Sequence, residues 1–282
     1  MTIQWFPGHM AKAQRELEEK LKLVDFIIEL VDARAPLSSQ NPMLQNMLKE
    51  KPKLMVLMKS DLADPRETEQ WINTFENEGN VAIAVNVNNK ADISQIVRHG
   101  KQLGQNKIDQ LEKKGIKSRP PRAVIIGIPN VGKSSLINRL ANKKIAKTGD
   151  RPGVTKHQLW IKVKGEFDLL DTPGILWPKF EDQSIGYRLA AIGTIKDNLF
   201  SMQDVIAHVI LYLQEHYPMA LYDRYGIDKT MEDMWEVFSE IGKRRGALES
   251  GGHVNFDKVA EIVSRDLRTG KLGRITLEKV DI

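Results

Sequence analysis

The 282-residue chain has no cysteine, which excludes a disulfide framework, a thiolate zinc site and a cysteine nucleophile. It also lacks any apolar run of the ~18–20 residues that a membrane-spanning helix needs. Residues 1–7 lack a charged start followed by a long apolar core, so we expect no cleaved secretory signal. These absences fit the reducing cytoplasm, although many exported proteins also lack cysteine.

Charge is distributed unevenly along the chain. Residues 1–180 carry 29 Lys and Arg against 20 Asp and Glu, whereas residues 181–282 carry 13 against 17. A dense run over residues 98–122 contains eight basic and two acidic side chains. Excess positive charge favours polyanionic partners, but a solvated helix face explains such a run equally well.

Hydrophobic patterning divides the chain in two. Helical segments separate strand-length apolar runs in the first part, which predicts an α/β fold with a mostly parallel sheet and helices on both faces. After residue 180, helical periodicity covers residues 205–215, 230–241 and 256–267. We therefore predict one domain over residues 1–180, with a short arm at 1–10, and a small all-helical domain over 181–282. The expected strands cover residues 26–31, 54–58, 81–85, 123–126, 159–163 and 167–170.

Residues 127–134, Gly-Ile-Pro-Asn-Val-Gly-Lys-Ser, match the phosphate-loop pattern Gly-x4-Gly-Lys-Ser/Thr between a strand and a helix. Glycines let backbone N–H groups turn toward phosphate oxygens, and the helix N-terminus favours an anion. Lys133 can reach the β- and γ-phosphates, and Ser134 can bind Mg²⁺. The predicted nucleotide contacts here are Asn130, Val131, Gly132, Lys133, Ser134 and Ser135.

A second motif, Asp-Thr-Pro-Gly at residues 171–174, follows an apolar strand. Asp-x-x-Gly alone is a weak signal, but about 40 residues after a phosphate loop it indicates a nucleotide site. Asp171 can hold Mg²⁺ through water, and the Gly174 N–H can sense a γ-phosphate. Thr155 in the intervening segment can complete the Mg²⁺ shell. An ordinary loop threonine is the alternative for Thr155.

Together these motifs resemble translation-factor-type GTPases, which carry an Asn-Lys-x-Asp base-reading motif downstream. Here the corresponding Met-Lys-Ser-Asp lies upstream, at residues 58–61. That order, with Trp-Phe-Pro-Gly-His-Met at residues 5–10 and the segment 171–178, is similar to the circularly permuted GTPase family over essentially the whole chain. The resemblance implies a GTPase that converts GTP and water to GDP and phosphate.

The resemblance places the guanine base against Met58, Lys59, Ser60 and Asp61. The Asp61 carboxylate can accept two hydrogen bonds from guanine that adenine does not offer, and the Lys59 stem can cover the purine face. Met58 replaces the family's asparagine and cannot make its amide hydrogen bonds, so we expect binding to be weaker by about 1–3 kcal/mol. The family also contacts the base edge near Asn86 and Val87, where a simple turn is the alternative.

Hydrolysis needs a group that positions water, and Ile175 stands where many GTPases have glutamine. The resemblance implies His9 as the catalytic residue, since a neutral imidazole can orient or deprotonate water. Without the resemblance, a surface or capping histidine is the simpler interpretation. Asn130 corresponds to an asparagine that helps to hold K⁺ in potassium-activated relatives. A purely loop-stabilising role is the alternative for Asn130.

The resemblance further implies a cytoplasmic assembly factor that acts late in maturation of the large (50S) ribosomal subunit and is stimulated by the ribosomal particle. The helical domain would dock on 23S rRNA, with no membrane or DNA partner. The alternative function is a nucleotide-sensing RNA-binding module with incidental hydrolysis. Basic residues that suit phosphate contacts, unless they form a solvated face, are Lys243, Arg244, Arg245, Arg265, Arg268, Lys271 and Arg274.

Overall fold

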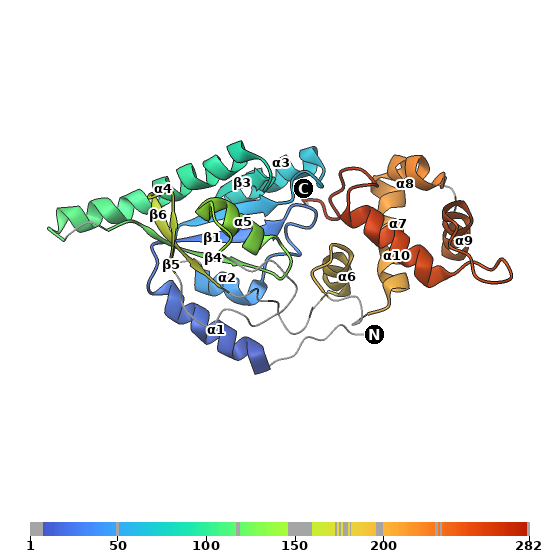
Figure 1. Ribbon diagram of the computed structural model, residues 1–282, viewed down its shortest axis with the longest axis horizontal. Coiled ribbons are helices and arrows are strands. Elements are labelled where there is room, and N and C mark those ends of the chain that lie inside the picture. Colours follow the sequence, from blue (N-terminus) through green and yellow to red (C-terminus); the bar gives the residue numbers. More distant parts are fainter. Residues whose placement is uncertain are drawn as a thin grey trace.

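The computed structural model describes residues 8–48, 51–116, 119–145, 160–172, 174, 176, 180, 182–195, 200–228, 231 and 233–280, without the side chains of residues 8–14 and 46. Its centre is a six-stranded sheet with the order β3-β2-β1-β4-β6-β5 (Figure 1). All neighbours pair in parallel except β5 and β6, as the alternation of strands and helices predicted. The strands are β1 (Phe26–Asp32), β2 (Lys53–Met58), β3 (Val81–Val85), β4 (Arg122–Gly127), β5 (Trp160–Val163) and β6 (Phe167–Asp171).

Helices cover both faces of this sheet. On one face, α2 (Pro42–Leu48) contacts β1 through a hydrogen bond from Gln45 to Glu29, and α3 (Pro65–Asn77) packs Trp71 and Phe75 against alternate residues of β1 and β2. On the other face lie α4 (Lys90–Lys113) and α5 (Lys133–Ala141). The long α4 approaches closely because Gly100 leaves room for Phe167: a Cβ there would lie 2.8 Å from that ring. The N-terminal helix α1 (Gly8–Leu21) lies below the sheet, near α2 (Figure 1).

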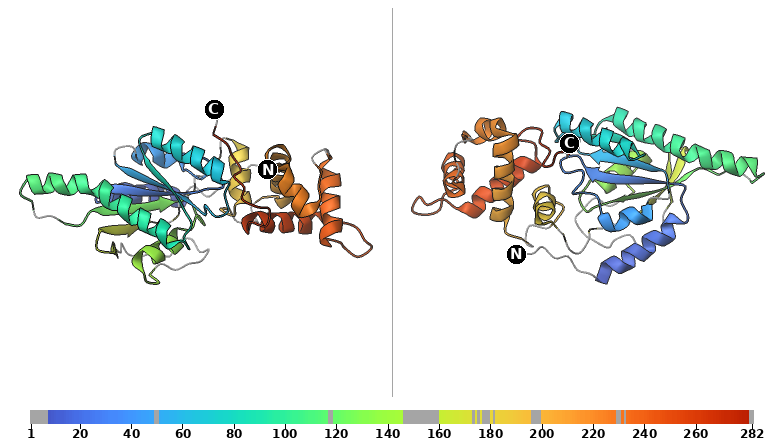
Figure 2. Two further views of the ribbon diagram at one scale, coloured as in Figure 1. Left: turned by 90° about the horizontal axis from the view of Figure 1, so that it is seen from above. Right: turned by 180° about the vertical axis from the view of Figure 1, so that it is seen from behind.

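A bundle of helices follows the sheet and lies to one side of it (Figure 2). The expected helix at residues 230–241 begins later, as α9, because the Asp233 side chain caps it by accepting a hydrogen bond from the Trp235 N–H at 2.8 Å. That correction aside, helical structure occupies the regions where periodicity predicted it. The elements are α6 (Gln183–Ala191), α7 (Met202–His216), α8 (Pro218–Tyr225), α9 (Met234–Arg245) and α10 (Phe256–Arg268).

The chain does not end inside the helical bundle. After α10, residues 270–280, which we call the C-terminal tail, return to the sheet and lie beside α3 (Figure 1). Leu277 and Ile275 on this tail are buried. Neither the motifs nor the hydrophobic patterning of the sequence predicted that residues 270–280 contact the domain that contains the sheet.

None of the described helices combines the length and the apolar character needed to cross a bilayer.

Candidate active site

Five loops meet at one edge of the sheet, because the carboxyl ends of β1, β2, β3, β4 and β6 all point the same way. Open parallel sheets bind their ligands at this edge. The loops that follow these strands contain most of the residues singled out from the sequence.

The phosphate loop, residues 127–134, joins β4 to α5. Its backbone turns sharply at Asn130 (φ 60°) and Gly132 (φ 105°), both in the left-handed region. Gly132 is the N-cap of α5 and has no side chain to occupy the first turn. The N–H donors of that turn are therefore left for an anion.

Asp171 lies directly beside the phosphate loop. The Lys133 ammonium donates to Asp171 Oδ1 at 2.7 Å, and both side chains are largely buried. The next residue, Thr172, is held against β4, because its hydroxyl donates a hydrogen bond to the Ile125 carbonyl at 2.6 Å. Gly174 passes close to the loop, since a Cβ on it would lie 3.1 Å from Pro129. The structure thus brings Asp171 to Lys133 and Gly174 to Pro129 of the phosphate loop, while Thr155 lies outside the described residues.

The loop of residues 58–63, which we call the base-recognition loop after its predicted role, follows β2 and contacts the phosphate loop. The Lys59 ammonium donates to the main-chain carbonyl of Asn130 at 2.9 Å. Met58 is buried, and its methyl group lies 3.2 Å from the Cβ position of Gly132. Asp61 is exposed. Met58 therefore supports the phosphate loop by apolar packing, where an asparagine would supply polar contacts.

A buried ion pair at the end of β1 holds Lys59 in place. Asp32 Oδ2 accepts from Lys59 Nζ at 2.9 Å and from Arg34 Nη2 at 2.8 Å. Burial by itself raises the pKa of Asp32, but the Arg34 and Lys59 cations lower it more, so the pKa lies well below its ordinary 3.8. Asp32 belongs to none of the motifs that the sequence offered. An aspartate directly after a strand, at the same edge as the phosphate loop, was the available signal.

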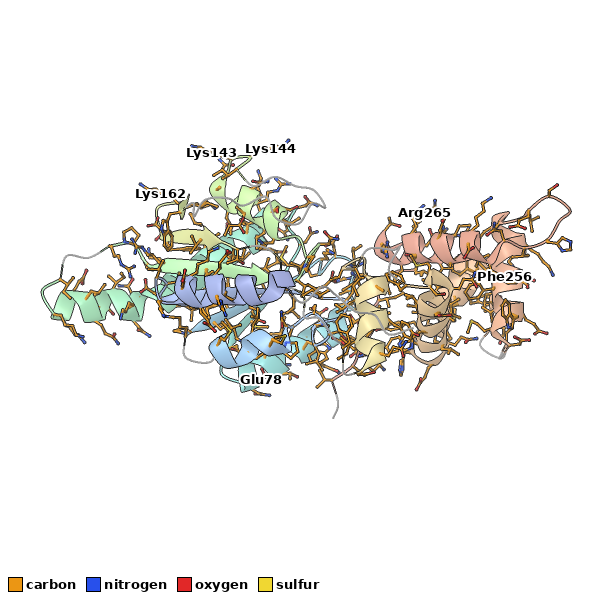
Figure 3. The ribbon with its side chains drawn as sticks, turned by 90° about the horizontal axis from the view of Figure 1, so that it is seen from below. Glu78, Lys143, Lys144, Lys162, Phe256 and Arg265 are labelled. Carbon is orange, nitrogen blue, oxygen red and sulfur yellow. The ribbon has the colours of Figure 1, made fainter. Side chains whose placement is uncertain are left out.

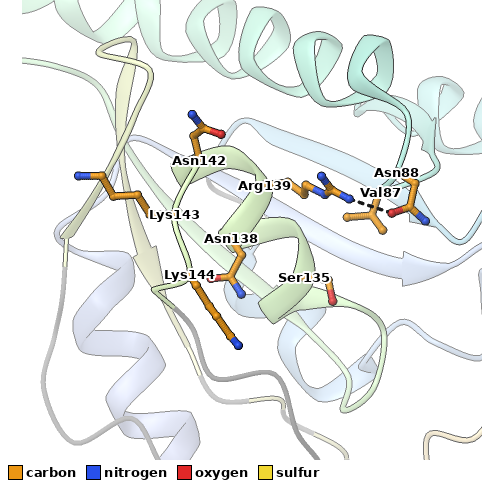
Figure 4. A pocket seen from close by; sticks show the side chains of 8 residues that line it. All are labelled: Val87, Asn88, Ser135, Asn138, Arg139, Asn142, Lys143 and Lys144. Atoms are coloured by element: carbon orange, nitrogen blue, oxygen red, sulfur yellow. Dashed lines mark hydrogen bonds between the residues drawn. The ribbon is translucent and has the colours of Figure 1, made fainter.

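Asn86 shapes the turn after β3. Its main-chain N–H donates to the Asp92 carboxylate and its side chain accepts from the Asn88 N–H. Asn88 in turn accepts from Arg139 of α5 at 3.0 Å, so the turn and α5 are tied together (Figure 4). A cavity of about 640 Å³ opens between them. It is lined by Val87, Asn88, Ser135, Asn138, Arg139, Asn142, Lys143 and Lys144.

Two further contacts join the site to its surroundings. The Asn130 amide donates to the Gly193 carbonyl, just after α6, at 2.9 Å. Lys20 of α1 donates to the Asp171 carbonyl at 3.3 Å. Burial is the largest influence on the pKa of Lys20 and lowers it, against the opposing charges of Glu16 and Asp171. No sequence motif singled out Lys20, but it lies on α1, which begins at Gly8 and so includes the backbone of His9 and the last three residues of the expected arm at 1–10. The His9 side chain lies outside the described residues.

Several basic residues that suited RNA phosphates have partners within the protein. Arg268 donates to the carbonyls of Ala190 and Ala191 at the end of α6. Arg244 pairs with Glu240. Arg245 stacks over Tyr225, and Arg274 contacts the base-recognition loop. Lys243, Arg265 and Lys271 are exposed.

Comparisons with known proteins agree with this geometry. A family described as "50S ribosome-binding GTPase" matches residues 122–244. Ribosome biogenesis GTPase A from Bacillus pumilus is 54% identical over 279 residues, covering 99% of both chains. Mitochondrial ribosome-associated GTPase 1 from Bos taurus is 32% identical, covering 99% of this chain and 89% of its own.

Solved structures show the same fold. The GNP-bound structure of YlqF from T. maritima has a TM-score of 0.65 and 25% identity, covering 96% of this chain and all of its own. The fold is thus a circularly permuted GTPase domain followed by a helical region. The 54% identity to the Bacillus pumilus protein over nearly the full chain shows the family: the chain belongs to the ribosome biogenesis GTPase A proteins and is a GTP-binding, GTP-hydrolysing enzyme of ribosome biogenesis.

Proposed function

We propose that the protein binds GTP across the loops at the carboxyl edge of the sheet and uses its hydrolysis late in maturation of the large (50S) ribosomal subunit. The observation that carries the nucleotide site is the 2.9 Å hydrogen bond from Lys59 to the Asn130 carbonyl. It joins the base-recognition loop to the phosphate loop, although they are 71 residues apart in the chain. A single purine nucleotide can therefore span both.

In this proposal Asp61 accepts hydrogen bonds from guanine, Lys59 covers the purine face, and Ser60, Asn86 and Val87 border the base. Met58 acts from behind the phosphate loop, because its side chain is buried. The phosphates lie on the N–H groups of residues 130–135 and on Lys133. Lys133 would then exchange its contact with Asp171 for phosphate oxygens.

The donors at the site suit Mg²⁺. Ser134 and Asp171 offer hard oxygen ligands, with the Asp171 contact running through water, and Lys133 holds Asp171 beside the loop at 2.7 Å. Within the described ranges, no three His, Asp or Glu side chains cluster as a self-contained metal site. A Mg²⁺ ion here would share phosphate oxygens, neutralise their charge, and be completed by Thr155, while the Gly174 N–H meets the γ-phosphate.

Asn130 is the candidate ligand for K⁺. Its amide nitrogen donates to Gly193, so the side-chain oxygen is the atom available to a cation. Hydrolysis that is faster in KCl than in NaCl supports this role, and equal rates count against it.

His9 is the candidate for orienting the attacking water. The resemblance of residues 5–10 to the permuted family supports this role. The His9 backbone belongs to the first turn of α1, whereas the described contact of that helix with Asp171 is made by Lys20 at its other end. We expect His9→Ala to retain GTP affinity and to lose hydrolysis stimulated by ribosomal particles, while the exposed His253→Ala behaves as wild type. Unchanged stimulated turnover in His9→Ala would remove His9 from the reaction.

The ribosomal partner is proposed to be the large-subunit precursor and its 23S rRNA, which places the protein in the cytoplasm. Exposed Lys143, Lys144 and Lys162 of the sheet domain and Arg265 of α10 lie on the same side of the molecule, opposite Glu78 (Figure 3). A face with cations from both parts suits an RNA backbone, and its binding should weaken with salt.

The test is sedimentation of cell extract with a non-hydrolysable GTP analogue. We expect the protein to migrate with a large-subunit precursor, and Lys133→Ala to remain in the unbound fractions. Absence of the wild type from every ribosomal fraction would defeat the proposal. Binding without any acceleration of hydrolysis by large subunits would favour a nucleotide-sensing RNA-binding module instead.

A further inference from the structure

The C-terminal tail makes direct hydrogen bonds to the base-recognition loop. The Arg274 guanidinium spans the loop: Nη2 donates to the Ser60 carbonyl and Nε to the Ala63 carbonyl, both at 2.8 Å. The Ile275 N–H donates to the carbonyl of Leu62 at 3.0 Å. Three of the four carbonyls at residues 60–63 thus accept hydrogen bonds from the tail.

The neighbouring residues extend this contact. The Thr276 hydroxyl accepts from the Asp64 N–H at 3.2 Å, at the start of α3, and donates to the Ala33 carbonyl at 3.3 Å. Gly270 also packs close to the loop, because a Cβ there would lie 2.9 Å from Leu62. The tail therefore bridges the ends of β1 and β2 at the edge where the site lies.

The tail itself is firmly anchored to the sheet domain. The buried Glu278 carboxylate accepts from the Leu37 and Ser38 N–H groups and from the Ser38 hydroxyl. The Trp71 indole N–H of α3 donates to the Glu278 carbonyl at 3.3 Å, and the Leu277 N–H donates to the main-chain carbonyl of Arg34 at 2.7 Å. Such an anchor gives Arg274 a fixed position from which to hold the loop.

The loop needs external support. Lys59 adopts a left-handed backbone (φ 59°), which a non-glycine residue keeps only when surrounding contacts enforce it. Asp61, the residue assigned to guanine, is exposed and lies between the carbonyls that the tail holds. A small displacement of this backbone would move the Asp61 carboxylate away from the base.

We propose that the C-terminal tail, through Arg274, positions the base-recognition loop and thereby sets the affinity for guanine nucleotides. Arg274 is a positioning residue, since it contacts loop carbonyls and not the nucleotide. The tail continues directly from α10, so the helical region and the guanine site are joined by a few residues of chain. This inference rests on the proposed contact between Asp61 and guanine.

The test compares steady-state GTP hydrolysis by the wild type and Arg274→Ala, with the exposed Arg15→Ala as a matched loss of one positive charge. We expect Arg274→Ala to raise KM for GTP about tenfold with kcat within about twofold of wild type, since slow chemistry makes KM report binding. Arg15→Ala should match the wild type. Arg274→Lys should lie between the wild type and Arg274→Ala, because a lysine ammonium cannot reproduce both guanidinium hydrogen bonds with the same geometry.

Three outcomes overturn the inference: an unchanged KM in Arg274→Ala, a fall in kcat with no rise in KM, or an equal rise in KM in Arg15→Ala. Asp61→Asn separates this inference from the proposed site. Exchange of carboxylate for amide should shift preference from GTP to xanthosine triphosphate, whose C2 oxygen accepts a hydrogen bond. Without that shift the site assignment fails. With it, an unchanged KM in Arg274→Ala defeats the tail proposal alone.

Discussion

The phosphate loop and the base-recognition loop lie at the same sheet edge but are built in opposite ways. Consecutive residues make the phosphate loop, from the end of β4 through Gly132 into the first turn of α5. The base-recognition loop depends on distant groups instead, namely Asp32 on one side and Arg274 on the other. One binding surface thus combines a local motif with a segment whose shape is imposed from elsewhere in the chain.

This difference has a consequence for permuted chains. A local motif keeps its shape wherever it stands in the order of the sequence, because its strand, turn and helix move together. A loop held by remote partners keeps its shape only if the new connections still deliver those partners. Here β1 and the C-terminal tail deliver them.

The largest effect is expected from Asp32→Ala, which removes one of the distant groups that hold the base-recognition loop. It leaves the buried Arg34 guanidinium without its carboxylate and frees Lys59, which we expect to cost about 3–5 kcal/mol of unfolding free energy. Urea unfolding measures this, with Glu261→Ala, an exposed carboxylate of α10, as the control. A loss no larger than that of the control would show that Asp32 does not hold the base-recognition loop.

The next largest effect is expected from Lys133→Ala, which tests the phosphate loop. If Lys133 contacts the phosphates as we propose, loss of its ammonium should weaken GTP binding roughly 100-fold, while the fold is retained. Titration of a fluorescent GTP analogue reports the affinity, and the exposed Lys162→Ala serves as the matched control. An affinity within a few-fold of wild type would contradict a phosphate role for Lys133.

Met58→Asn tests the contact between the two loops, where the Met58 side chain packs against Gly132. An amide beneath Gly132 can donate to phosphate-loop carbonyls, so we expect GTP affinity to rise by up to about tenfold. The apolar Met58→Leu should not strengthen binding. Weaker binding in Met58→Asn would mean that the packing of the methionine matters more than the missing hydrogen bonds.

The smallest effect concerns pH and the anchor of the tail. Burial raises the pKa of Glu278 above its ordinary 4.5, against the hydrogen bonds from Ser38 and the charge of Arg188. Between 4.5 and the raised pKa, the folded protein holds a proton that the unfolded chain has released, so this group's contribution to stability falls as pH rises.

Urea unfolding at several pH values above about 4.5 tests this expectation. Glu278→Gln keeps an acceptor for the Leu37 and Ser38 N–H groups but cannot titrate, so its unfolding free energy should vary less with pH than that of the wild type. Identical pH dependences would show that Glu278 is ionised in the folded protein throughout this range.

Much of the architecture followed from local signals. Apolar runs bounded by turn residues located the strands, and the alternation with helices gave the mostly parallel sheet. The start of α9 was misplaced because periodicity does not reveal which acidic residue acts as the cap, here Asp233. The roles of the candidate site residues remain predictions. The structure does place Lys59 in hydrogen-bonding contact with Asn130, and Lys133 with Asp171.

The basic residues show where sequence reasoning reaches its limit. Arg268 and Arg274 lie in a run that suited RNA phosphates, but their guanidinium groups donate to protein carbonyls. Spacing along a helix indicates which charges share a face. It does not indicate whether another part of the chain comes to meet that face.

The sequence by itself determined the phosphate loop, the sheet and the family, because each depends on residues close together in the chain or on a set of motifs in a fixed order. Only the tertiary structure decided how Lys59 is held, why Met58 is tolerated, and where the last residues go. Those features depend on contacts between segments as far apart as Ser60 and Arg274, and such contacts form only when the whole chain has folded.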